Sequence, residues 1–253
     1  MTIGPPAPRA AAAPNPPPTR PHPPPTRRPP ENAMIRTLIA LALGAAALAA
    51  QADEGFERVK VFLERNLLDK DAEVKFEITG GKAGLAALKV VAPDGRTVID
   101  FKAPDSKLGL RHLALESPEP ANDGRVQADF PAGVYTFTGR GTDGAALAGK
   151  ATLSHAFPEA TAFVRPRADA TGVPHQGLQI AWSAVKGLDA FVVVIVNEKS
   201  GREVRARLAA SSTTFAVPAG FLQPATEYKL EIGSVAKDGN ATFIETAFTT
   251  AGK

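Results

Sequence analysis

Acidic side chains gather in one short stretch near residue 70. Asp69 and Asp71 flank Lys70, and Glu73 follows two residues later. Alternating carboxylates in a loop between strands suit Ca²⁺, a hard cation that takes about six to eight oxygen ligands. Two carboxylates are too few to fill that shell, and the intervening lysine lowers the local negative charge. The stretch therefore predicts either a calcium site at Asp69 and Asp71, completed by other loops, or a solvated turn.

Histidine, serine and cysteine offer little for catalysis. The chain has no cysteine, and His112, His155 and His175 lie too far apart in sequence to show metal-ligand spacing. Ser154 and His155 are neighbours on an expected strand, so they point to opposite faces. No G-x-S-x-G, glycine-rich phosphate loop or H-E-x-x-H motif occurs. We expect no enzyme activity, no catalytic residue and no cofactor; the alternative is an enzyme subunit with a site between domains.

The apolar run Phe191–Val196 is a candidate interface. A strand of an antiparallel sandwich normally has one polar face, but both faces of this run are apolar. If Phe191 and every second residue after it face the core, Val192, Val194 and Val196 form an outward stripe. The stripe predicts contact with a preceding domain or a partner. Alternatively, these β-branched residues only satisfy strand propensity.

The first 52 residues differ in composition from the rest. Residues 4–30 are dominated by Pro, Ala and Arg, which favour extended, solvated conformations. A basic start at Met34, an apolar run over 38–50 and Ala50-Gln-Ala52 are typical of a secretory signal peptide, too short to cross a bilayer. We expect residues 1–33 to be a disordered extension or a start-site artefact and 34–52 to be cleaved. The product should be periplasmic or secreted, with no membrane anchor.

The charge of the remaining chain argues against nucleic-acid binding. Residues 1–52 hold five of the 29 basic side chains and one of the 26 acidic ones. Residues 53–253 therefore hold 24 basic and 25 acidic side chains, a net charge of −1 against +3 for the whole chain. A nearly neutral, evenly mixed surface lacks the basic patch that nucleic acid requires.

From residue 59 onward, short segments of alternating apolar and polar residues recur between turn residues. Val74, Phe76 and Ile78, for example, alternate with charged residues before Gly80-Gly81. Residues 117–124 are expected to be a loop, and no helix is expected after residue 52. The expected strands are 59–64, 74–78, 85–91, 96–101, 108–116, 134–139, 146–155, 178–182, 188–197, 202–208, 213–217, 228–236 and 242–248. This spacing predicts an all-β sandwich architecture.

The motif Leu222-x-Pro-x-Thr-x-Tyr228 precedes a strand with one apolar face, and Trp182 stands on an earlier strand. Residues 160–250 thereby resemble a fibronectin type III domain. The resemblance implies that Tyr228 buries its ring and returns its hydroxyl to the backbone upstream. Residues 130–137 and 147–155 resemble exported bacterial proteins that pair an Ig-like sandwich with a fibronectin-like one.

We therefore expect an all-β fold of two tandem Ig-like/fibronectin III-like β-sandwiches, at residues 53–158 and 159–253. The expected function is that of an exported, non-enzymatic binding or scaffolding protein that acts through sandwich surfaces. Its partner is expected among envelope or extracellular proteins. A calcium-assisted adhesion module is the alternative. Fold alone does not specify the function.

Overall fold

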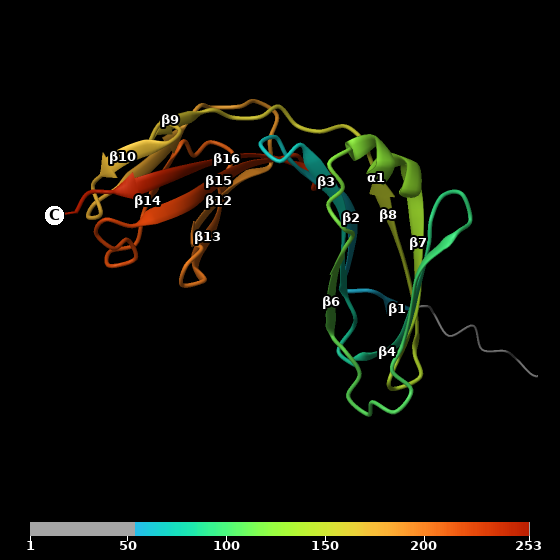
Figure 1. Cartoon of the computed structure of the whole chain (residues 1–253). Helices are drawn as coiled ribbons and strands as arrows, with labels where there is room; N and C mark the ends of the chain where they lie inside the picture. Colours follow the sequence, from blue (N-terminus) through green and yellow to red (C-terminus); the bar gives the residue numbers. More distant parts are fainter. Residues whose placement is uncertain (1–53, 253) are drawn as a thin grey trace, which may run out of the picture. The chain divides into compact units, whose positions relative to one another are not determined.

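A computed structural model describes residues 54–252, and nearly all of its regular elements are β-strands (Figure 1). The elements are β1 (Glu54–Gly55), β2 (Arg58–Asn66), β3 (Asp71–Thr79), β4 (Leu85–Val91), β5 (Thr97–Lys102), β6 (His112–Glu116), α1 (Asp123–Asp129), β7 (Gly133–Gly141), β8 (Ala146–Leu153), β9 (Phe163–Arg165), β10 (Ala170–Val173), β11 (Gln179–Trp182), β12 (Ala190–Asn197), β13 (Arg202–Ala209), β14 (Thr214–Ala216), β15 (Glu227–Val235) and β16 (Ala241–Thr250). The all-β prediction with two sandwiches is confirmed. The expected signal peptide and Pro-rich extension lie outside the described residues.

The first sandwich packs the sheet β1-β8-β7-β4-β5 against the strands β2-β3-β6. On β3, Val74, Phe76 and Ile78 are buried and alternate with more exposed residues, as the period-2 pattern predicts. Tyr135 and Phe137 reach the same core from β7. The rings of Phe76 and Tyr135 meet edge to face with centroids 5.9 Å apart, a favourable geometry for aromatic pairs.

The second sandwich packs β13-β12-β15-β16 against the smaller sheet β14-β11-β9. Trp182 lies in its core, 5.5 Å from the ring of Phe191. The Tyr228 hydroxyl accepts a hydrogen bond from the Gln223 N–H (2.8 Å) and donates one to the Phe221 carbonyl (3.4 Å). The expected tyrosine corner is therefore present.

The first sandwich contains a similar hydrogen bond from a buried tyrosine to the backbone, which the sequence analysis did not predict. The Tyr135 ring is fully buried, and its hydroxyl donates to the Pro131 carbonyl at 3.1 Å. Burial raises the pKa of Tyr135 to about 12, so the phenol keeps its donor proton at neutral pH. A tyrosine thus fixes the entry to a central strand in each sandwich.

Two expectations for the segment between residues 108 and 130 are wrong. The expected strand 108–116 begins only at His112, because Gly109 has a positive φ of 65° and turns the chain. The expected loop instead leads into helix α1. Asn122 caps this helix by accepting from the Gly124 N–H at 2.9 Å, and Val126 anchors it in the core.

The two sandwiches are joined by backbone and side-chain hydrogen bonds. β16 runs parallel to β2, with Ala241 opposite Glu64 and Phe243 opposite Asn66, so strands of both sandwiches share one sheet path. The buried Asn240 amide accepts from the Leu63 N–H (2.8 Å) and donates to two carbonyls of the first sandwich (2.9 Å each). The predicted domain boundary between residues 158 and 159 implies that each sandwich folds by itself, and it stays a prediction.

Candidate functional site

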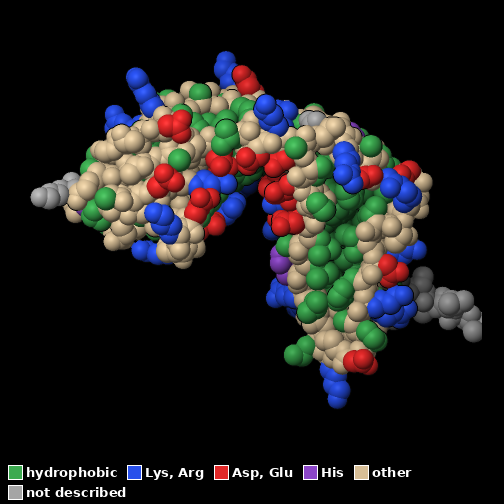
Figure 2. Space-filling view, viewed as in Figure 1, with side chains coloured by type: hydrophobic (Ala, Val, Ile, Leu, Met, Phe, Trp, Pro, Cys, Tyr) green, Lys and Arg blue, Asp and Glu red, His purple; other side chains and the backbone are tan. Residues whose placement is uncertain are grey.

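A charged pocket lies where β2 and β3 meet β13, β15 and β16, and we call it the junction pocket. Its volume is about 240 Å³. Twelve residues line it: Glu64, Arg65, Asn66, Asp69, Asp71, Glu73, Lys75, Glu119, Arg205, Lys229, Glu231 and Phe243. Carboxylates outnumber cations by six to four in this lining, so the pocket is formally negative. Acidic and basic side chains crowd together in the middle of the space-filling view (Figure 2).

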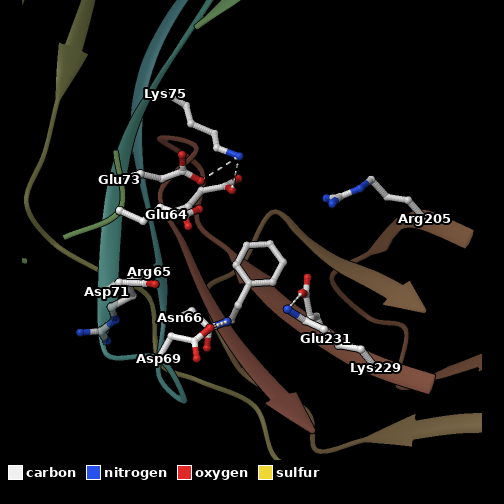
Figure 3. A pocket seen from close by; sticks show the side chains of 12 residues that line it. Glu64, Arg65, Asn66, Asp69, Asp71, Glu73, Lys75, Arg205, Lys229 and Glu231 are labelled. Atoms are coloured by element: carbon white, nitrogen blue, oxygen red, sulfur yellow. Dashed lines mark hydrogen bonds and ion pairs between the residues drawn. The ribbon is translucent and has the colours of Figure 1, made fainter. Parts of the chain in front are cut away.

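One wall of the pocket is an ion cluster around Lys75. The ammonium lies 2.9 Å from Glu64, 3.0 Å from Glu73 and 3.4 Å from Glu116. Figure 3 shows the side chains of Lys75, Glu64 and Glu73 converging. Register explains the cluster, since Glu64 on β2 stands opposite Glu73 on β3 and Lys75 follows on the same face. Burial alone would lower the pKa of Lys75, but the charges and hydrogen bonds of Glu64 and Glu73 have the larger effect and raise it.

Glu73 is the most perturbed carboxyl group of this cluster. The residue is only 6% exposed, its Oε1 contacts Lys75, and its Oε2 is buried with no hydrogen-bond partner among the described residues. Burial raises the pKa of Glu73 to about 7, because the Lys75 ammonium offsets only part of the desolvation. Near neutral pH this carboxyl group is therefore divided between its charged and neutral forms.

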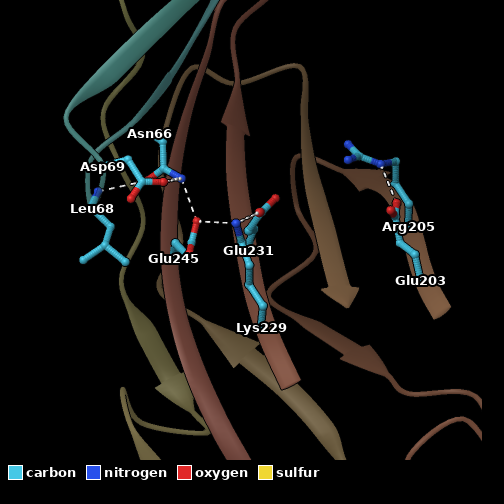
Figure 4. Close-up of polar contacts among 8 residues, drawn as sticks. All are labelled: Asn66, Leu68, Asp69, Glu203, Arg205, Lys229, Glu231 and Glu245. Atoms are coloured by element: carbon cyan, nitrogen blue, oxygen red, sulfur yellow. Dashed lines mark hydrogen bonds and ion pairs between the residues drawn. The ribbon is translucent and has the colours of Figure 1, made fainter. Parts of the chain in front are cut away.

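The opposite wall contains a second ion cluster, around Lys229 (Figure 4). The Lys229 ammonium lies 2.9 Å from both Glu231 and Glu245. Asn66 of the first sandwich donates to the same Glu245 at 2.7 Å. Burial opposes the charge of Lys229, but Glu245 and Glu231 outweigh it and raise its pKa. Asn66 of the first sandwich and Lys229 of the second thus contact the same carboxylate, that of Glu245.

The structure places both predicted calcium ligands in the lining of this pocket. Asp69 is exposed on the β2–β3 turn and accepts a long hydrogen bond from Asn66 (3.4 Å), while Asp71 opens β3 and is half-buried. Burial raises the pKa of Asp71, and the charge of Asp69 raises it further. Residues 54–252 contain no group of three or more His, Asp or Glu side chains arranged to hold a metal ion. Calcium binding at the pair stays a prediction.

The predicted valine stripe borders the same pocket. Val194 is only 1% exposed although it faces away from its sandwich core. Its cross-strand neighbours are Arg205 and Glu231, both in the pocket lining. Val192 packs against a small cluster that includes Phe243, and Val196 is half-buried. Whether the stripe serves as an interface stays a prediction.

Within residues 54–252, no metal-binding group forms from the three histidines present there, His112, His155 and His175. His112 Nδ1 lies 3.3 Å from the Thr79 hydroxyl, and His155 Nε2 lies 2.8 Å from the Phe130 carbonyl. The Ser154 hydroxyl accepts from a backbone N–H two residues later. These contacts tie the side chains to nearby backbone and hydroxyl groups and leave Ser154 and His155 without a mutual bond within the described residues.

The sequence analysis did not predict the role of Asn240 or the pairing of Glu73 with Lys75. Asn240 follows Asp238-Gly239 and looks like an ordinary hairpin residue, so nothing local signals its contacts with residues more than 80 positions away. Glu73 had a usable signal, because the turn after residue 65 sets the register that pairs Glu64 with Glu73. Charged residues opposite each other on a sheet face interact directly. That reasoning would have found the Lys75 cluster.

No protein-family model matches the chain. No curated protein matches it either. In the described part of the chain, no helix is long and apolar enough to cross a membrane.

Solved structures of tandem β-sandwich modules resemble the chain at low scores. Fibronectin(III)-like modules of Clostridium thermocellum CbhA match with 9% identity and a TM-score of 0.32, covering 77% of this chain and 94% of that one. A segment of two fibronectin type III domains from chicken tenascin matches with 15% identity and a TM-score of 0.30, covering 70% and 92%. A tandem repeat from the extending region of a large adhesion protein matches with 14% identity and a TM-score of 0.29, covering 78% and 50%. No activity follows from likenesses of this size.

Proposed function

We propose that the chain is an exported, non-enzymatic binding or scaffolding protein that holds an extended segment of an envelope or extracellular protein. The observation that carries this proposal is the open edge of the first sandwich. Within the described residues, β5 pairs only with β4 and β6 only with β3. Strand edges with unpaired backbone groups can accept an additional strand from a partner.

Exposed apolar side chains accompany these free edges. Leu108, Leu110 and Leu115 are 86%, 44% and 39% exposed, and Ile99 and Phe101 reach the core from β5 only half-buried. Figure 2 shows hydrophobic side chains over this sandwich. A partner strand would satisfy the edge backbone and cover these side chains, which explains why a binding role fits better than a purely structural one.

The junction supports the scaffolding part of the proposal. Tandem domains usually move relative to each other unless their interface is extensive. The β2–β16 ladder and the three Asn240 hydrogen bonds favour a fixed spacing between sandwiches. A fixed spacing would let one sandwich hold the other in a constant position relative to a bound partner.

An enzyme with a site between the sandwiches is less well supported, although the junction pocket does bring carboxylates together. Glu64 and Glu73 share the Lys75 ammonium, and Glu231 shares that of Lys229. The Glu64 and Glu231 carboxylates are held in ion pairs with lysines, and the unpaired oxygen of Glu73, the group with the raised pKa, is out of reach of solvent. A substrate proton therefore has poor access to these groups.

Calcium-assisted adhesion is the second candidate, favoured by the position of Asp69 and Asp71 in a negative pocket. A pull-down from a bacterial envelope extract with the full chain, in calcium and chelator buffers, separates the candidates. We expect one specific protein to be retained in both buffers and lost with Leu115→Arg. The matched control Leu68→Arg changes a leucine that is 58% exposed outside the edge and should retain the partner. Retention only with calcium would favour adhesion, and retention by Leu115→Arg would contradict the edge proposal.

A further inference from the structure

The free edge of β5 is short and has a definite bound at each end. At one end, the register with β4 skips Val98, which marks a β-bulge beside Ile99. At the other end, Pro104 has no N–H and cannot continue a ladder of backbone hydrogen bonds. The regular part of the edge is therefore Ile99–Ala103, and Phe101 lies at its centre.

The backbone of this edge offers hydrogen-bonding groups at two residues. The Ala103 N–H donates to the carbonyl of Ala86, which leads into β4, at 2.8 Å, so the peptide groups of residue 103 point toward that strand. These directions alternate along an antiparallel strand. The N–H and C=O groups of Asp100 and Lys102 therefore point away from β4, and no strand of the described residues pairs with them.

The side chains of the same two residues carry opposite charges. Asp100 and Lys102 lie on one face of the strand, and their side chains are 52% and 73% exposed at a separation of 3.7 Å. An ion pair this exposed contributes little within one chain, so both charges remain available to another chain. On the other face, Phe101 packs against the core and is only half-buried.

A second copy of the chain matches this edge when the two strands run antiparallel. A two-fold axis at Phe101 places Asp100 of each copy directly opposite Lys102 of the other. Each of these pairs can exchange two backbone hydrogen bonds, and opposite charges facing each other across strands are stabilising. Moving the axis by one residue places Asp100 or Lys102 opposite its own copy, which brings like charges together. The charges therefore select one register.

The free edge of β13 does not have this complementarity. Its sequence contains three arginines against one glutamate, so two copies would repel each other there.

We propose that two copies of the chain form a dimer through antiparallel pairing of their β5 edges, with the two-fold axis at Phe101. Such an interface is isologous and closes at two copies. The dimer goes beyond the proposed function and leaves β6, with Leu115, free for a partner segment. Because each copy contributes only the short edge Ile99–Ala103, we expect a weak dimer with a dissociation constant of about 10–100 µM.

Sedimentation equilibrium of the full chain, from about 1 to 500 µM, tests the proposal. Asp100→Lys and Lys102→Asp each place like charges opposite each other, and each should weaken the dimer at least about tenfold. An equimolar mixture of the two variants restores opposite charges in both pairs and should form a heterodimer about as tightly as the parent dimer. The control Glu198→Lys changes an exposed carboxylate of the second sandwich and should change the dissociation constant less than twofold.

The mixture separates a loss of pairing from a loss of folding, because unfolded variants could not restore the dimer. A parent chain that stays monomeric at every concentration, an unchanged dissociation constant in both variants, or a mixture that stays monomeric would overturn the proposal.

The envelope pull-down distinguishes this dimer from the proposed function. Asp100→Lys should still retain the envelope protein, since that protein is expected at β6. Loss of the protein with Asp100→Lys and its retention by Leu115→Arg would assign β5 to the partner and overturn the β5 dimer. A dimer that follows the charge pattern while no envelope protein is captured would support the pairing and contradict the proposed function.

Discussion

Replacing Asn240 by alanine removes three hydrogen bonds at the point where the two sandwiches meet. The side chain is 1% exposed, and its loss leaves the Leu63 N–H and the carbonyls of Ser154 and Ala156 without this partner. Each such bond contributes about 1 kcal/mol net, so the free energy of unfolding should fall by about 3 kcal/mol. For a protein with roughly 200 folded residues, the melting temperature should fall by roughly 6–12 °C.

Two readouts separate a local effect from a junction effect. Trp182 is the single tryptophan and lies in the second sandwich, so its fluorescence follows that sandwich during denaturation. Amide hydrogen exchange at Leu63 follows the first sandwich. We expect Asn240→Ala to accelerate exchange at Leu63 strongly, because its acceptor is the Asn240 side chain.

The matched control is Asn197→Ala, at the half-buried end of β12, where the side chain accepts one hydrogen bond from the Ser200 N–H. It should cost less than about 1 kcal/mol and leave exchange at Leu63 unchanged. If Asn240→Ala remains within about 0.5 kcal/mol of the parent and Leu63 stays protected, the junction hydrogen bonds do not couple the sandwiches.

Four further substitutions test the remaining assignments. Tyr228→Phe should lower the free energy of unfolding by about 1–2 kcal/mol and Tyr135→Phe by about 1 kcal/mol, in denaturant titrations, because two and one hydroxyl hydrogen bonds are lost. Burial holds the pKa of folded Glu73 at about 7 against 4.5 for the ordinary group; the folded state binds more protons between these values, so stability should fall as pH rises from about 4.5 to 7. Glu73→Gln should flatten that slope, and an unchanged slope would contradict the assignment. Val194→Lys should cost about 2–3 kcal/mol because it buries a charge, whereas Val164→Lys, at a 55% exposed valine, should be nearly neutral in thermal unfolding.

Local pattern was sufficient for most strands and for the second sandwich. Alternation at Val74, Phe76 and Ile78 fixes which face is buried, since side chains of a strand point to opposite faces in turn. The spacing of Leu222, Pro224 and Thr226 before Tyr228 likewise identified a corner whose hydrogen bonds span at most seven residues. These features depend on near neighbours in the chain, which is why sequence reasoning reaches them.

The helix α1 shows where local pattern misleads. Asn122-Asp-Gly124 is equally compatible with a turn and with a capped first helical turn, and seven residues are too few to display a helical period. Burial of Val126 in the core of the first sandwich favours the helix. Tertiary packing, not intrinsic propensity, therefore decides this segment.

The sequence by itself determined the class of fold, the two tyrosine-bearing strands and the acidic character of the stretch around Asp69 and Asp71. Only the tertiary structure decided that this stretch faces Lys229 and Glu231 across a pocket, and that Asn240 bonds to the first sandwich. The physical reason is the separation along the chain between the groups that interact. Strand periodicity and turn geometry act over a few residues, whereas the charge balance of a pocket depends on groups more than 150 positions apart, which come together only when β16 pairs with β2.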